Sequence, residues 1–174
     1  GSAGRRAAFR LPDAMAAAAR RMRGADGARI GFVEDTGWDT HRGQLQALQR
    51  KFGELDAGLR ALEQGLGTDW NRTVVAVVTE FGRTAAVNGS AGTDHGVGGH
   101  ALLAGGAGRG GRISGDWPGL GPRDLHEGRD LRASGDLRAL FKGLLVAHLG
   151  LPEALVESRV FPDSRPVRAM GGLV

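Results

Sequence analysis

The chain has 174 residues, of which 41% are hydrophobic and 24% charged, a composition typical of a soluble globular domain with its own core. It contains no cysteine and no tyrosine, which excludes disulfides, thiol chemistry and a phenolic general acid. The net charge of +4 comes from arginines scattered among acidic residues, and apolar runs stay below the roughly 18 residues of a membrane span. We therefore expect neither a nucleic-acid-binding surface nor a membrane span.

In the first part of the chain, the sequence pattern predicts two helices separated by a strand. Residues 7–23 form an alanine-rich helix, with Pro12 suited to its first turn. Residues 28–35 form a short buried strand. Residues 40–66 form a long helix, because apolar residues recur there at alternating steps of three and four. The members of this stripe are Leu45, Leu48, Phe52, Leu55, Leu59, Leu62 and Leu66. A coiled coil would show the same stripe, but strands on both sides favour a crossover helix on a sheet.

The second part of the chain predicts further strands and a final pair of helices. Residues 72–80 form a strand that is apolar on both faces, which is typical of a parallel or mixed sheet covered by helices. After a glycine-rich loop, strands are expected over residues 100–106 and 111–117. A helix follows over residues 136–149, and a short helix begins at Pro152. The order predicts a single domain over residues 1–174 with an α/β fold. Its sheet is mixed, mostly parallel, and flanked by helices.

Polar side chains follow the ends of the predicted strands. They are Asp39 and His41, then Glu80 and Arg83, then Asp94, His95 and His100. In an open α/β sheet, ligands bind beyond the carboxyl ends of the strands, so we expect these side chains to converge. Carboxylates and imidazoles can hold a divalent cation without cysteine. Such a cation would polarise a phosphoryl or sulfuryl oxygen, or lower the pKa of a bound water.

Each of these groups also has a purely structural interpretation. Asp39 would serve as the cap of the long helix, and Glu80 with Arg83 as an ion pair. Asp94 suits a turn, and His100 suits a hydrogen-bonded position in the core. No nucleophile is identified, because no local feature activates any of the nearby hydroxyls. These hydroxyls belong to Thr40, Thr79, Thr84 and Ser90.

Five motifs follow one another over residues 37–120, within a resemblance that runs from about Arg29 to the C-terminus. They read GWDTH, TEFGRT, GTDHG, LLAGG and RGGRISGDWPGL. In this order they resemble the domain of unknown function 1501 family, which is itself similar to the alkaline phosphatase and sulfatase superfamily. The resemblance covers most of the chain and implies an alkaline-phosphatase-like fold.

The superfamily resemblance implies a metal-dependent hydrolase of phosphate or sulfate esters. It implies a zinc, manganese or calcium ion bound by Asp39, His41 and His95. Asp94 and Glu80 are expected as further ligands or as carboxylates behind them. Arg83 and His100 are expected to contact the anionic substrate, either a small ester or a polysaccharide. Phe81 departs from the superfamily pattern, which has an Asp-His pair at this point for a second metal.

The resemblance further implies that a longer family member supplies the nucleophile from an N-terminal half. This chain is then expected to be the C-terminal portion of such a protein. Full-length members typically carry a twin-arginine export signal, which implies a periplasmic location in bacteria. The alternative is a degenerate or truncated family member that serves as a non-catalytic binding or structural domain.

Overall fold

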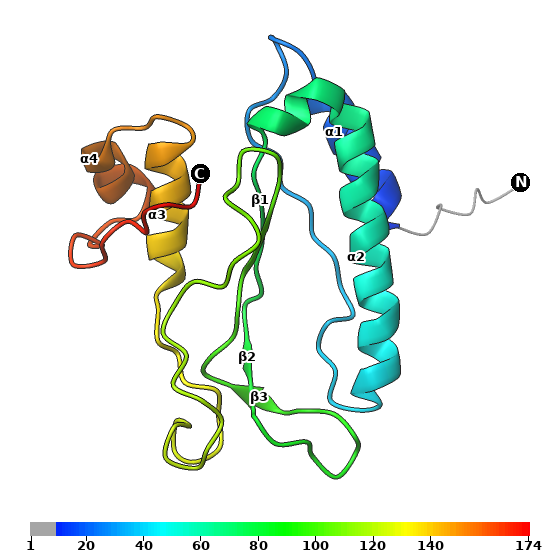
Figure 1. Cartoon of the computed structure of the whole chain (residues 1–174), viewed down its shortest axis with the longest axis vertical. Helices are drawn as coiled ribbons and strands as arrows, with labels where there is room; N and C mark the ends of the chain where they lie inside the picture. Colours follow the sequence, from blue (N-terminus) through cyan, green and yellow to red (C-terminus); the bar gives the residue numbers. More distant parts are fainter. Residues whose placement is uncertain (1–9) are drawn as a thin grey trace, which may run out of the picture. The chain divides into compact units, whose positions relative to one another are not determined.

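The computed structural model describes residues 10–174, and the contacts among them define two compact units (Figure 1). Unit 1 comprises residues 10–72 and 87–94, and unit 2 comprises residues 73–86 and 95–174. The single domain expected over residues 1–174 stays a prediction. Residues 7–9 of the first expected helix lie outside the described residues. No described helix is long and apolar enough to cross a membrane.

Unit 1 is built on a pair of packed helices. Helix α1 spans Leu11–Met22, and helix α2 spans Gln44–Leu66 and continues into the 3-10 helix η1 over Gly67–Arg72. The α1 residues buried in this unit are Leu11, Met15 and Ala19, and those of α2 are Leu55, Gly58, Leu62 and Leu66. The carboxyl-terminal half of the predicted stripe is therefore buried, as its spacing predicts.

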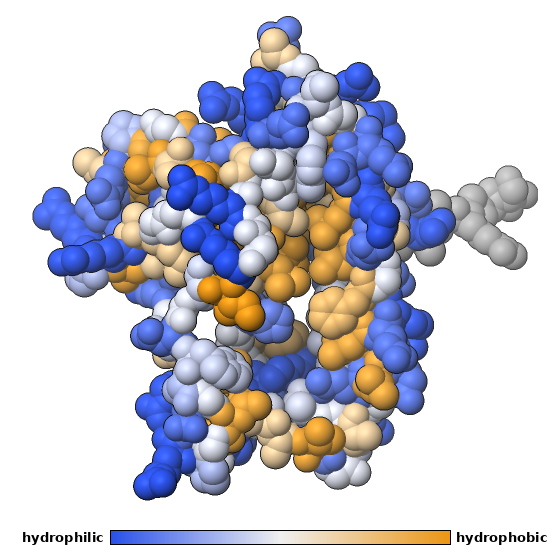
Figure 2. Space-filling view, in the orientation of Figure 1, coloured by the Kyte–Doolittle hydropathy of each residue, from blue (hydrophilic) through white to orange (hydrophobic). Residues whose placement is uncertain are grey.

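A glycine lets α1 and α2 approach closely. A Cβ atom at Gly65 would lie 2.5 Å from the Cβ atom of Ala19, which is closer than real side chains allow. The amino-terminal half of the stripe is more open, since Leu45 is 67% exposed and Phe52 is 46% exposed. Figure 2 shows this apolar surface along α2. The expected role of α2 as a crossover helix between strands is not observed, because residues 28–35 form no strand.

Unit 2 contains two small antiparallel sheets. Strand β1 (Val75–Val77) pairs with β4 (Leu102–Ala104), and β2 (Gly82–Arg83) pairs with β3 (His95–Gly96). The structure is thus mixed α/β, but the mostly parallel sheet expected from the sequence is absent from the described residues. The reason is the connection: no helix separates β1 from β4, and parallel neighbours need such a crossover.

The remaining part of unit 2 is irregular and then helical. The strand expected over residues 111–117 is not formed, and Ile113 within it is 99% exposed. Helix α3 spans Leu137–Ala147, which confirms the helix expected over residues 136–149. Its N-cap is Asp136, and the side-chain hydrogen bond from Arg138 lowers the pKa of that carboxyl.

The chain ends in a segment that packs onto α3. Helix α4 spans Glu153–Leu155 and continues as a π-helix, η2, over Val156–Val160. The fully buried Lys142 of α3 donates from Nζ to the Glu157 carboxylate at 2.8 Å. It also donates to the carbonyl oxygens of Ser164, at 3.0 Å, and Val167, at 2.8 Å. This lysine therefore ties the C-terminal segment to the helix.

Candidate metal centre

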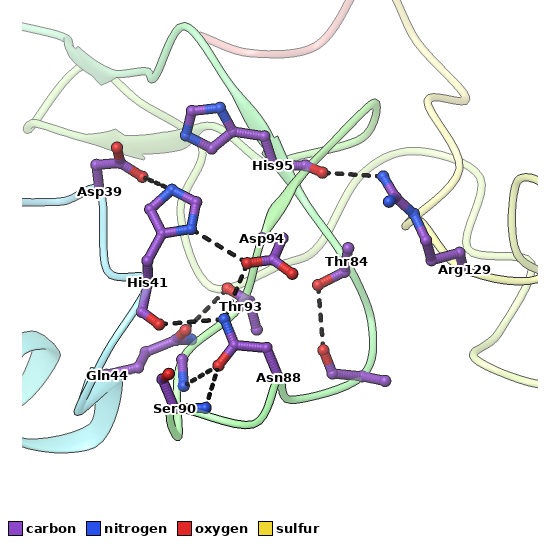
Figure 3. Close-up of polar contacts among 12 residues, drawn as sticks. Asp39, His41, Gln44, Thr84, Asn88, Ser90, Thr93, Asp94, His95 and Arg129 are labelled. Carbon is purple, nitrogen blue, oxygen red and sulfur yellow. Dashed lines mark hydrogen bonds and ion pairs between the residues drawn. The ribbon is translucent and has the colours of Figure 1, made fainter.

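His41 lies between two carboxylates in unit 1 (Figure 3). Its Nε2 atom is 3.0 Å from Oδ1 of Asp39, and its Nδ1 atom is 3.2 Å from Oδ1 of Asp94. All three side chains are roughly half exposed, so a ligand from solvent can reach them. A neutral imidazole has one N–H and can satisfy only one carboxylate. The other ring nitrogen therefore needs a second proton or a bound cation between it and the facing oxygen.

Asn88 connects the two chain segments that supply the carboxylates. Its Nδ2 atom donates to the carbonyl oxygen of His41 at 3.1 Å and to Oδ1 of Asp94 at 2.9 Å. Its Oδ1 atom accepts from the backbone N–H groups of Ser90, at 2.9 Å, and Gly92, at 3.1 Å. No local signal in the sequence marks Asn88 as a site residue, because Asn88-Gly89 is typical of an ordinary turn.

The loop 87–94 is fastened to the start of α2 by its backbone. The N–H groups of Gly43 and Gln44 donate to the carbonyls of Ser90, at 3.1 Å, and Ala91, at 2.9 Å. Gly92 lies so close to the chain that an added Cβ atom would be 2.2 Å from the carbonyl carbon of His41. Only glycine fits at this point, which explains part of the glycine excess in this region.

The segment before Asp39 is anchored separately to α2. Lys51 of α2 pairs with Asp35 at 2.6 Å and with Glu54 at 2.7 Å, and the Trp38 indole donates to Asp35 at 2.7 Å. Trp38 also meets Phe52 edge-on, with ring centroids 5.4 Å apart. Partial burial lowers the pKa of Lys51, but the hydrogen bonds from Lys51 to its two carboxylates outweigh this and raise it overall.

The structure distinguishes between two expected roles of Asp39, as the cap of α2 and as a residue of the site. The N-cap of α2 is Gly43, which makes no side-chain capping hydrogen bond, so Asp39 does not cap this helix. Its carboxylate instead faces His41. Thr40 is 6% exposed, and its carbonyl oxygen accepts from the N–H of Thr93 at 3.3 Å. Asp39, His41 and Asp94 are therefore brought together, while their role as ligands stays a prediction.

The other predicted site residues belong to unit 2. The Arg83 guanidinium lies over the ring of Phe81, 4.5 Å from its centroid. His95 follows Asp94 directly in the chain, pairs with Arg83 across β2 and β3, and stacks on Phe81. Glu80 and His100 are exposed, so His100 does not occupy the core position that its sequence context suggests.

Comparison with known proteins gives one match. The family model described as "Protein of unknown function (DUF1501)" matches residues 7–162. No curated protein and no solved structure matches the chain. The match covers all five motifs and all of the candidate site residues.

Proposed function

We propose that this chain, which belongs to the DUF1501 family of proteins of unknown function, binds a divalent metal ion through Asp39, His41 and His95. Each of these side chains offers one atom of the kind that binds such cations. The observation that carries the proposal is the position of His41 between two carboxylates, with Nε2 3.0 Å from Asp39 and Nδ1 3.2 Å from Asp94.

The surroundings of His41 suggest a role for each ring nitrogen. In this proposal Nδ1 carries the proton and donates to Asp94, which lies 3.2 Å away and whose Oδ1 atom also accepts from Asn88. This hydrogen bond fixes the tautomer and leaves the Nε2 lone pair directed toward the cation, beside the Asp39 carboxylate. Asp94 then orients His41 rather than binding the metal. His95 joins as the third ligand, since it is the residue after Asp94.

The ligand types favour some cations over others. Two imidazole nitrogens with one carboxylate oxygen suit zinc or manganese, whereas calcium prefers six to eight oxygen ligands. Three protein ligands leave a coordination position open for water or substrate. Phe81 offers no ligand for a second ion, so we propose a site for one metal ion.

The reaction that we propose is the hydrolysis of phosphate or sulfate esters, as in the alkaline phosphatase and sulfatase superfamily. The motif order supports this, together with the chemistry of a single open metal site, which polarises an ester oxygen or activates water. Arg83 would bind the anionic group of the substrate, and His100 would contact it. The competing proposal is a metal-binding domain without turnover, which the phenylalanine at position 81 favours.

The test is metal content and zinc affinity of the purified chain beside the variant His41→Ala. We expect close to one metal ion per chain and a loss of at least tenfold in zinc affinity in the variant. His148→Ala, at the end of α3 in unit 2, is the matched control and should bind zinc like the wild type. Equal zinc affinity in the His41→Ala variant, or no metal binding by the wild type, would overturn the metal site.

Turnover is tested separately. The metal-loaded chain is assayed with 4-nitrophenyl phosphate and 4-nitrophenyl sulfate, and hydrolysis that disappears in His41→Ala supports the esterase proposal. A fully loaded protein that hydrolyses neither ester supports the non-catalytic alternative.

A further inference from the structure

The ring of His95 is stacked on the ring of Phe81 within unit 2. The two ring centroids are 5.1 Å apart, and the ring planes are inclined by only 8°. Phe81 comes directly before β2, and His95 begins β3, which pairs with β2. His95 is an exposed residue on a strand of two residues, where an imidazole would normally rotate freely. The stack holds this imidazole in one plane.

Two arginines contact Phe81 and His95. The Arg83 guanidinium lies over Phe81, 4.5 Å from the centroid, and Arg83 is the residue opposite His95 in the β2–β3 register. Arg129 donates from Nη2 to the carbonyl oxygen of His95 at 3.2 Å, and its Nε atom pairs with the buried Asp130 at 2.7 Å. The backbone of His95 and its ring are thus held by different contacts.

We infer that Phe81 is a positioning residue that fixes the ring plane of His95 for metal binding. The inference rests on the proposed function, in which His95 is a ligand. A ligand that is already held in one rotamer loses less conformational freedom when the metal binds.

The experiment measures zinc affinity by competition with a chromophoric chelator. The proteins compared are the wild type, Phe81→Leu, Phe81→Tyr and His95→Ala. We expect Phe81→Leu to bind zinc about tenfold more weakly, as is typical when a residue that orients a ligand is removed. Phe81→Tyr keeps the aromatic ring and should bind within about threefold of the wild type. The matched control is Phe141→Leu, which disrupts the Phe141–Phe161 ring pair of the same unit and should leave zinc affinity unchanged.

A second measurement tests the stack without metal. In the nuclear magnetic resonance spectrum of the metal-free protein, at least one ring proton of His95 should resonate upfield of its counterpart in His148, because the His95 ring is stacked in a nearly parallel plane against Phe81. The upfield position should disappear in Phe81→Leu and persist in Phe81→Tyr. A His95 ring with every proton at the position of its counterpart in His148 would overturn the inference, whatever the stability of the variants.

The outcomes separate this inference from the proposed function. Wild-type affinity in His95→Ala would remove His95 from the site, and the inference would fail together with that ligand assignment. Weak binding by His95→Ala with wild-type affinity in Phe81→Leu would overturn the positioning role alone. Weak binding by both, with recovery in Phe81→Tyr, supports the inference.

Discussion

At the scale of single residues, the candidate site depends on a side chain that binds no metal. Asn88 is half-buried and uses both its amide and its carbonyl, so it fixes the loop and the two metal-site segments at once. Its contact with Asp94 also leaves that carboxylate oriented toward His41. The geometry around His41 is therefore set by an uncharged residue, whose contribution does not weaken with salt as an exposed ion pair does.

We expect Asn88→Ala to lower zinc affinity by about tenfold, because Asp94 would lose the donor that orients it. The same change leaves the backbone N–H groups of Ser90 and Gly92 without their acceptor, and it should reduce the free energy of unfolding by about 1–3 kcal/mol. Zinc titration and urea denaturation measure the two effects.

The control for Asn88→Ala is Asn71→Ala, an exposed asparagine of η1 in the same unit. It should change the free energy of unfolding by less than about 0.5 kcal/mol and leave zinc affinity intact. If Asn88→Ala bound zinc as tightly as the wild type, Asp94 would not need Asn88 for its orientation, and the proposed role of Asp94 would weaken with it.

At the scale of elements, the helices could be predicted and most strands could not. The apolar stripe and the glycine stop are local signals, so α2 and α3 begin and end within a few residues of the expected positions. A strand forms only where it can pair with another strand, and the local sequence pattern does not identify that second strand. Residues 28–35 have the composition of a strand, yet Phe32 is 84% exposed and no paired strand forms there.

The candidate site, like the fold, could be predicted from the sequence only in part. The proximity of Asp39, His41 and Asp94 was expected from the placement of polar residues after predicted strands, although the strand expected before Asp39 is not formed. What brings the residues together is the loop 87–94, pinned to the start of α2 by backbone hydrogen bonds. Such pairing between distant segments has no periodic signature in the sequence, so the attachment of this loop to α2 could not be predicted.

The packing of α1 on α2 predicts opposite effects for two glycines of the same helix. Gly65→Ala places a methyl group 2.5 Å from the Ala19 Cβ atom and should lower the free energy of unfolding by about 1–3 kcal/mol. A Cβ atom at Gly53 would have no other atom within 4 Å. Gly53→Ala should therefore raise the free energy of unfolding by about 1 kcal/mol, since alanine is the better helix former. Thermal and urea unfolding of the two variants measure the difference.

Compensation by a second substitution would show that the close contact between the two helices causes the loss of stability in Gly65→Ala. Ala19→Gly removes the methyl group opposite Gly65, so the double variant should recover part of the loss, which a double-mutant cycle quantifies. Simple additivity of the two single changes would mean that these residues do not touch, and the packing of α1 on α2 would need another explanation.

At the scale of the whole molecule, the two units reach stability by different means. Unit 1 has a leucine-rich helix pair, in which Leu55, Leu62 and Leu66 are at most 7% exposed. In unit 2 a fully buried lysine lies among the buried apolar residues, and its ammonium group is held by a carboxylate and two carbonyl oxygens. A buried charge of this kind stabilises a fold only while its partners remain in place.

We expect Lys142→Met to lower the free energy of unfolding by about 1–3 kcal/mol, because it leaves the carbonyl groups of Ser164 and Val167 without their donor and takes the closest cation from the half-buried Glu157. Hydrogen exchange should quicken in α3 and in residues 153–170, which Lys142 ties together. Exchange in α1 and α2 should change little, since Lys142 makes its hydrogen bonds within unit 2.

Ser164→Ala is the control for Lys142→Met, because it alters the same buried region but is not expected to lower the free energy of unfolding. The Ser164 hydroxyl is fully buried and has no hydrogen-bond partner among the described residues, so its removal should be neutral or should stabilise the protein by about 1 kcal/mol. The carbonyl of Ser164, which accepts from Lys142, is retained in this variant. If Lys142→Met and Ser164→Ala destabilised the chain equally, apolar packing rather than the lysine network would hold the C-terminal segment.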